Sequence, residues 1–145
     1  MGKTNARLIA LMIGCCAAPV SAIAQETDLT GKLAIELNST TTSAQTCTLT
    51  FKITNGYPVD IDQLIYETVL FDATGTVNRL TLFDFGALPV GRPRVRQFVV
   101  PDVTCDALGQ VLLNGLHTCT SGGQNTDVCA TGLIATTRTA IEVLG

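Results

Sequence analysis

Apolar and polar residues alternate strictly over residues 46–54, and this pattern constrains the fold more than any other feature of the sequence. Cys47, Leu49, Phe51 and Ile53 occupy one set of alternate positions, and threonines with one lysine occupy the other. A period of two places the apolar set on one face of a β-strand, where β-branched residues such as threonine are also favoured. The segment therefore predicts a half-buried strand whose cysteine points into a core.

Six further segments carry strand patterns, and turn sequences separate them. Residues 63–72 are apolar on both faces, which is typical of a central strand or of one that carries an interface. No segment after residue 24 has the period of a long helix, although residues 106–109 could form a helical turn. The sequence therefore predicts an all-β fold, a single immunoglobulin-like β-sandwich of about seven strands. The expected strands are residues 32–38, 46–54, 63–72, 77–85, 92–100, 108–114 and 133–143.

The first residues have the three-part pattern of a secretory signal peptide. Two basic residues precede an apolar stretch over residues 8–20, and a small-residue cleavage site ends at Ala24. The stretch is shorter than the ~20 residues of a membrane span, so we expect no stable membrane insertion after cleavage. We expect a cleaved signal helix over residues 1–24 and one periplasmic or secreted domain over residues 25–145. In an alternative, lipoprotein-type cleavage leaves Cys15 as a lipid anchor.

Four cysteines follow the signal segment, and an even number in an oxidising compartment predicts two disulfides. Of the three possible pairings we favour Cys47 with Cys105, which spans most of the domain. Cys119 would then pair with Cys129 and close a loop rich in glycine, serine and asparagine. The alternative is a zinc site that includes His117, but the chain has no Cys-x-x-Cys pair, which structural zinc sites usually contain.

Composition excludes several classes of function. The chain has 9 basic and 12 acidic residues, so a nucleic-acid partner that is bound through phosphate neutralisation is not expected. It has one histidine, and its serines stand in no nucleophile motif, so we expect no enzyme. Asp60 and Asp62 have the spacing of two calcium ligands, but the rest of a calcium loop is missing. We therefore expect neither a metal nor a cofactor.

Three arginines form the first candidate interaction site. Arg92, Arg94 and Arg96 alternate along one expected strand, so their guanidinium groups share a face. Such a face could bind an anionic ligand or an acidic partner. Otherwise the arginines form a solvated sheet face or pair with Asp84 and Glu67. Phe98 continues the same alternation, which indicates either partial burial of that face or a bulge that shifts its phase.

Phe83 and Phe85 are the second candidate interaction site. They flank an aspartate just before Gly86, and exposed rings there would form an aromatic binding edge. The alternative is that both rings pack in the core and the aspartate serves the turn.

Two resemblances rest on longer motifs. The run Phe71-Asp72-Ala73-Thr74-Gly75, followed by Leu88-Pro89-Val90-Gly91, resembles bacterial immunoglobulin-like domains of the FxLYD and CARDB kind. The segment Leu-Thr-Leu-Phe-Asp-Phe-Gly over residues 80–86, with residues 91–98, is similar to small exported proteobacterial proteins called Tat-pathway signal sequence domain proteins. These resemblances imply a fold and an exported location but no catalytic residues. The chain lacks the twin arginines of a Tat-pathway signal, so its export route stays open.

With nucleic-acid binding, catalysis and metal binding not expected, we predict that the protein is a non-enzymatic protein-interaction or assembly module. We expect it to offer a sheet edge or the arginine face to an unknown protein partner. The alternative is an accessory protein that binds a small anionic or envelope ligand through Arg92, Arg94 and Arg96.

Overall fold

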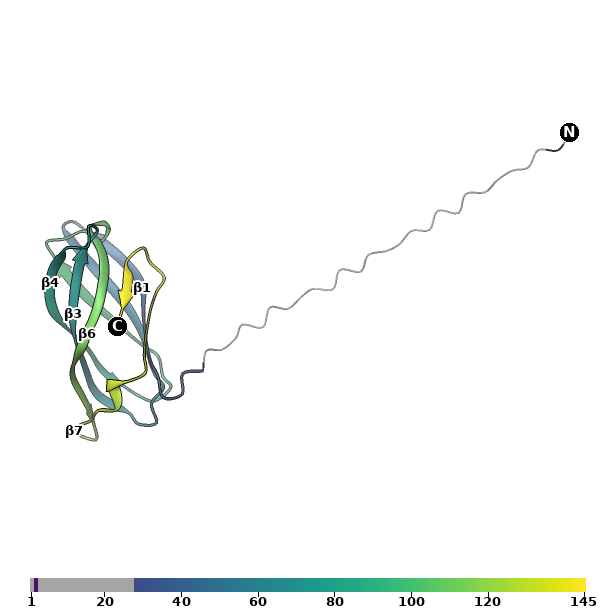
Figure 1. Cartoon of the computed structure of the whole chain (residues 1–145), viewed down its shortest axis with the longest axis vertical. Coiled ribbons are helices and arrows are strands. Elements are labelled where there is room, and N and C mark those ends of the chain that lie inside the picture. The colour runs from purple at the N-terminus through teal and green to yellow at the C-terminus, as the bar shows by residue number, and fades with distance from the viewer. Residues whose placement is uncertain (1, 3–27) are drawn as a thin grey trace.

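The computed structural model describes residue 2 and residues 28–145, and the latter form two β-sheets packed face to face (Figure 1). The strands are β1 Leu33–Ser43, β2 Thr46–Asn55, β3 Ile61–Asp72, β4 Val77–Leu88, β5 Arg94–Pro101, β6 Leu108–Ser121, β7 Gln124–Asn125, β8 Leu133–Thr137 and β9 Glu142–Leu144. One sheet has the order β5-β2-β1-β8. The other has the order β4-β3-β6-β7, and β9 also pairs with β6. The predicted all-β sandwich is confirmed.

The helical content of the described residues is limited to two short 3-10 turns, η1 Cys105–Ala107 and η2 Val128–Ala130. The first overlaps the helical turn expected at residues 106–109. In the part of the chain that the structure describes, no helix is long and apolar enough to cross a membrane. The expected signal helix over residues 1–24 and Cys15 lie outside the described residues.

Several strand boundaries differ from the expectation, and residues 28–145 form nine strands rather than about seven. β1 and β6 continue to Ser43 and Ser121, past the expected ends at residues 38 and 114, and β7 was not expected. The single strand expected over residues 133–143 is in fact two strands, because the chain crosses between the sheets after Thr137. β8 pairs in parallel with β1, and β9 pairs in parallel with β6. The strand expected from Arg92 begins only at Arg94, since Pro93 has no N–H with which to join the ladder.

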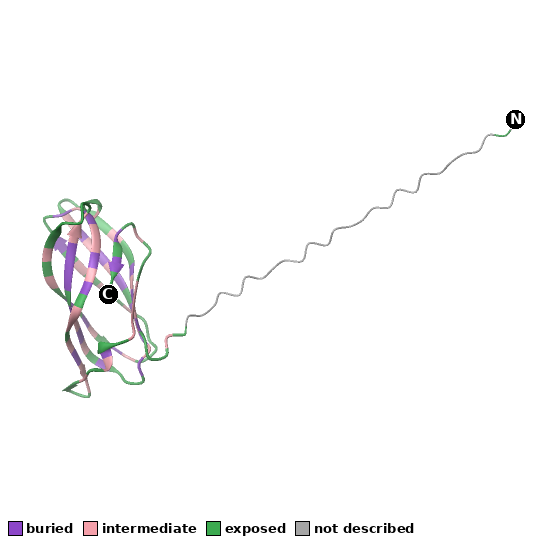
Figure 2. Ribbon diagram, viewed as in Figure 1, coloured by how far each residue is buried: buried purple, intermediate pink, exposed green. Residues whose placement is uncertain are grey.

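β2 has the burial pattern that its alternating sequence predicts. Its side chains at Cys47, Leu49, Phe51 and Ile53 are fully buried, and the threonines between them face outward. β2 lies between β1 and β5, and β3 likewise lies between β4 and β6. Unlike β2, β3 is also apolar on its outer face, where Ile65 and Phe71 are half-buried and Val69 is buried. Figure 2 shows the buried residues concentrated on the strands and the exposed residues in the connecting turns.

Four of the five phenylalanines form the contact between the two sheets. The ring of Phe51 on β2 meets Phe83, Phe85 and Phe98 edge-on, with centroid separations of 5.9, 5.8 and 5.9 Å. Phe83 on β4 and Phe98 on β5 stack in parallel at 4.0 Å. Edge-to-face pairs of this kind contribute about 1 kcal/mol each beyond the burial of area. The rings therefore join the two edge strands β4 and β5 through one apolar cluster.

Both tyrosines of the chain lie in the core. Tyr57 donates its hydroxyl to the carbonyl oxygen of Thr131 at 2.6 Å. Burial raises its pKa. Tyr66 is buried as well, and burial, with a smaller contribution from Tyr57, raises its pKa from 10.0 to about 12. A raised pKa in the folded state means that ionisation of the phenol opposes folding.

We predict that the folded protein shows no tyrosine ionisation with a midpoint near pH 10. Tyr66 contributes its full stability below pH 10, the unfolded value, and this contribution is lost as the pH rises toward 12. The pKa of Tyr57 is raised in the same direction. Near-ultraviolet absorbance measures phenolate directly, and the chain has no tryptophan. Guanidinium-unfolded protein is the control and should titrate near 10. A native titration that overlays the unfolded curve would contradict the burial of both rings.

Candidate interaction surface

Two disulfides fix the ends of the sandwich, in the pairing that the sequence favoured. Cys47 is bonded to Cys105, and Cys119 is bonded to Cys129. The first bond joins the start of β2 to η1, just before β6, rather than joining two strands in the middle of the sheets. Because all four sulfurs are in disulfides, the zinc site considered for these cysteines and His117 is wrong.

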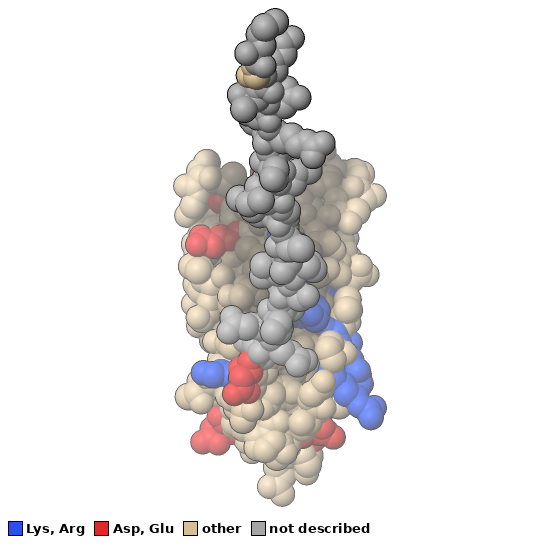
Figure 3. All heavy atoms as spheres, turned by 90° about the vertical axis from the view of Figure 1, so that its right-hand side faces the viewer, with Lys and Arg blue, Asp and Glu red and all other residues tan. Residues whose placement is uncertain are grey.

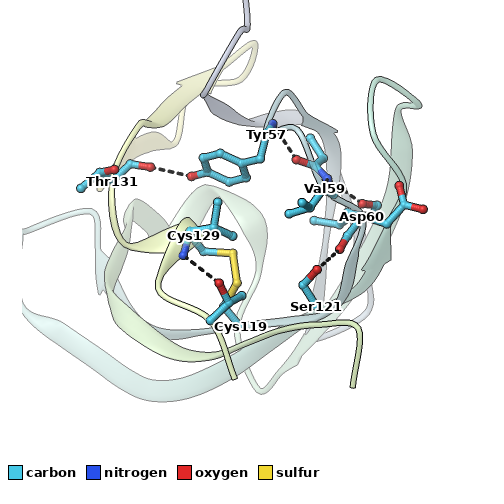
Figure 4. Close-up of a disulfide and its surroundings, with 11 residues drawn as sticks. Tyr57, Val59, Asp60, Cys119, Ser121, Cys129 and Thr131 are labelled. Carbon is cyan, nitrogen blue, oxygen red and sulfur yellow. Dashed lines mark hydrogen bonds between the residues drawn. A yellow bond between two sulfur atoms is a disulfide. The ribbon is translucent and has the colours of Figure 1, made fainter. Parts of the chain in front are cut away.

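The second disulfide anchors the loops at one end of the domain (Figure 4). Beside it, the Ser121 hydroxyl donates to the carbonyl oxygen of Asp60 at 2.7 Å, and the Tyr57 hydroxyl donates to Thr131. The Asp60 carboxylate accepts from the backbone N–H of Val90 at 2.7 Å, and the Asp62 carboxylate accepts from Gly123 at 2.8 Å. These two aspartates therefore hold neighbouring loops together. Among residues 28–145 no cluster of three or more His, Cys, Asp or Glu residues could hold a metal ion.

Arg96 binds the backbone of the opposite sheet. From β5 its Nε donates to the carbonyl oxygen of Phe85 at 2.8 Å, and its Nη2 donates to that of Ala87 at 3.2 Å, both on β4. Its Nη1 donates to the carbonyl oxygen of Val95 at 3.0 Å. Gly86 lies under the guanidinium with a φ of +66°, and an added Cβ would come within 3.4 Å of Nη2. Glycine at position 86 thus permits both the turn of the backbone and the close approach.

A second arginine links β4 and β5. Arg79 on β4 donates from its Nη2 to the carbonyl oxygen of Pro101 at the end of β5, at 2.8 Å. The open side of the sandwich is therefore closed by Arg96 near one end, Arg79 near the other and the stacked pair of Phe83 and Phe98. Unpaired strand edges invite aggregation, and these contacts cover the two longest edge strands.

The structure separates the three arginines of the first candidate site. Arg92 is exposed and precedes β5, whereas Arg94 and Arg96 are half-buried on the face of β5 that also carries Phe98. The alternative in which these arginines pair with Asp84 and Glu67 is wrong, because the one ion pair within residues 28–145 joins Arg138 to Glu36. On the face drawn in Figure 3, most of the visible basic side chains gather along one margin of the domain.

Phe83 and Phe85 do not form an exposed aromatic edge, which corrects their choice as candidate interaction residues. Phe83 is 3% exposed and Phe85 is fully buried. Both rings pack against Phe51 and Phe98, so the alternative of core packing is the one that the structure shows.

We predict that Arg96→Ala destabilises the fold by about 1–3 kcal/mol, since it leaves the partly buried carbonyl oxygen of Phe85 without this donor. Urea unfolding measures the free energy, and Arg96→Lys should recover only part of it because an ammonium cannot reach both carbonyls in the same plane. Arg92→Ala is the matched control and should stay within about 0.5 kcal/mol of the wild type. Equal stability of the two alanine variants would show that the arginine contacts do not close the sandwich.

A hollow of about 390 Å³ lies on the outer face of the β4-β3-β6 sheet. Leu80 and Leu82 on β4 are 73% and 50% exposed, and they line it together with Val69 on β3. The other lining residues are Glu67, Thr68, Thr81, Asn114 and His117. The sequence did not single out this surface. Its one signal was the apolar character of both faces of residues 63–72, which indicated either a central position or an interface.

Comparison with known proteins bears on the fold alone. No family model matches the chain and no curated protein matches it, so the two resemblances drawn from its motifs gain no support. Among solved structures, IrmA from Escherichia coli is similar, with a TM-score of 0.54 and 15% sequence identity. The match covers 72% of this chain and 90% of IrmA. The chain shares the overall fold of IrmA. At this identity the likeness shows the architecture and transfers no site residue.

Proposed function

We propose that the protein is an exported, non-enzymatic protein-interaction or assembly module that binds its partner with the outer face of the β4-β3-β6 sheet. One observation carries the proposal: Leu80 and Leu82 stand exposed side by side on β4, next to the hollow. Burying a leucine side chain releases about 1.5–3 kcal/mol, so a partner that covers both would gain substantially. Exposed apolar groups beside a hollow rimmed by polar residues are typical of interaction sites.

The closed edges of the sandwich favour docking on a face over addition of a strand. Arg96 already occupies two carbonyl oxygens of β4. On the other side of the domain, β8 has five residues, β9 has three and β7 has two. Such short strands offer little backbone for an added strand to pair with.

The two disulfides support the exported location. They are compatible with an oxidising compartment, as is the signal-peptide pattern over residues 1–24. In a periplasmic or secreted location, the module would meet envelope or extracellular proteins.

A photo-crosslinking residue placed at position 80 or 82 in the exporting host tests the proposal. We expect one protein to be captured from both positions, because they neighbour each other on the same face. The purified partner should then bind the wild type directly, and Leu80→Ser should weaken that binding about tenfold, in keeping with the loss of a buried leucine.

Positions 95 and 99 provide the matched control, because Val95 and Val99 are equally exposed apolar residues on the opposite sheet. Capture of the same protein from all four positions would indicate non-specific contact. Absence of any product from positions 80 and 82, with efficient products from 95 and 99, would place the interface on the other sheet and refute the proposal.

The alternative, binding of a small anionic or envelope ligand through Arg92, Arg94 and Arg96, has less support. Arg96 is engaged by three carbonyl oxygens, and Arg94 donates to the carbonyl oxygen of Pro93 at 3.2 Å. Arg92 alone is exposed, which leaves one free guanidinium where the sequence suggested three.

A further inference from the structure

We propose that the hollow on the β4-β3-β6 sheet receives a lysine or arginine side chain of the protein partner. The inference rests on the proposed interaction function and names the chemistry of its central contact. Three independent features point to it: the backbone irregularities of β6, the glycine between them and the charge of the lining.

Two β-bulges in β6 direct polar side chains into the same hollow. Glu67 pairs with Gly115 and Thr68 with Leu113, so Asn114 is an extra residue in the ladder. In the same way, Ile65 pairs with Thr118 and Tyr66 with Leu116, so His117 is a second extra residue. Bulges re-aim side chains and are common beside functional sites. Asn114 and His117 are both exposed, and both line the hollow.

Gly115 leaves the space between these two bulges open. It lies opposite Glu67 in the ladder, and a Cβ built on it would meet no atom within 4 Å. Its backbone is not in the left-handed region, so neither strain nor crowding requires glycine there. The missing side chain instead leaves a gap in the outward-facing row of β6. β3, β4 and β6 run side by side in Figure 1, and the gap opens on the sheet that they form.

The charge of the lining selects a cation. Glu67 is the one acidic residue that lines the hollow, and neither lysine nor arginine lines it. No basic group within residues 28–145 forms an ion pair with Glu67, since the one ion pair there is between Arg138 and Glu36. The carboxylate is exposed and is therefore accessible to a cation that a partner brings.

The hollow also has an apolar wall, which suits the methylene groups of a lysine or arginine side chain. Lysine and arginine bury their methylene groups along apolar surface while the charged head stays with polar groups. In the hollow, Leu80, Leu82 and Val69 offer the apolar wall, and Glu67 offers the acceptor. The Asn114 amide oxygen is a further acceptor for an ammonium or guanidinium.

Three short peptides test the inference by NMR titration of the isotope-labelled protein. Each is N-acetylated and C-amidated with the sequence Gly-Ser-Xaa-Ser-Gly, where Xaa is lysine, norleucine or glutamate. Norleucine keeps the apolar stem of lysine and lacks its charge. We expect the lysine peptide to bind most tightly, with shift changes centred on the amides of Glu67, Asn114 and Gly115, and the glutamate peptide to bind least.

Two variants separate the contributions of shape and charge. Gly115→Leu places a side chain opposite Glu67, which lines the hollow, and should reduce lysine-peptide binding at least tenfold. It should not prevent folding, because the added Cβ meets open space. Glu67→Gln should reduce it about fivefold, the effect of one exposed ion pair, and should leave norleucine binding unchanged. Gln97→Leu adds a leucine to the outer face of the opposite sheet and is the control, for which we expect no change.

Equal binding of the lysine and norleucine peptides, or shift changes away from Gly115, would overturn the inference. The inference also fails if Gly115→Leu folds and binds the lysine peptide like the wild type. These outcomes leave the interaction module intact as long as positions 80 and 82 still crosslink to one partner. Loss of that crosslinking as well would remove the proposed function itself.

Discussion

The packing of Phe51 against three phenylalanines from two edge strands is the contact on which the rest of the structure depends. Phe51 lies on the central strand β2, Phe83 and Phe85 come from β4, and Phe98 comes from β5. Because β4 and β5 belong to different sheets, this cluster closes the side of the sandwich that would otherwise be open. Arg96, on the same strand as Phe98, donates to the carbonyl oxygens of Phe85 and Ala87 on β4 and links the same two strands.

This cluster fills the core between the sheets, and the outward-facing leucines of β4 do not contribute to that core. The inner row of the strand provides Phe83, and the outer row provides Leu80 and Leu82. An apolar outer row on an edge strand costs solubility and adds little to folding. Two exposed leucines there, beside a hollow lined by one carboxylate, support the proposed binding surface. The fold and the proposed contact thus use opposite faces of the same strand.

The sequence predicted those features that depend on local pattern. Alternation over residues 46–54 determined the buried face of β2, and cysteine spacing together with loop composition favoured the observed disulfide pairs. The position of Phe98 in the arginine alternation left two alternatives, partial burial of that face or a bulge, and the structure shows partial burial. The partner of Arg96 could not be predicted, because it is a backbone carbonyl on a strand of the other sheet. The bulges at Asn114 and His117 were also beyond prediction, since a bulge exists only relative to the pairing register of β3.

The most direct test of the central claim is the free energy of unfolding of the double variant Leu80→Ser with Leu82→Ser. If the two leucines serve binding and not folding, urea unfolding should place the variant within about 0.5 kcal/mol of the wild type. Phe85→Ala, on the inner face of the same strand, should lose about 3–5 kcal/mol and shows the scale of a true core residue. A loss of about 2 kcal/mol or more in the leucine variant would make these side chains part of the folded core and contradict the account.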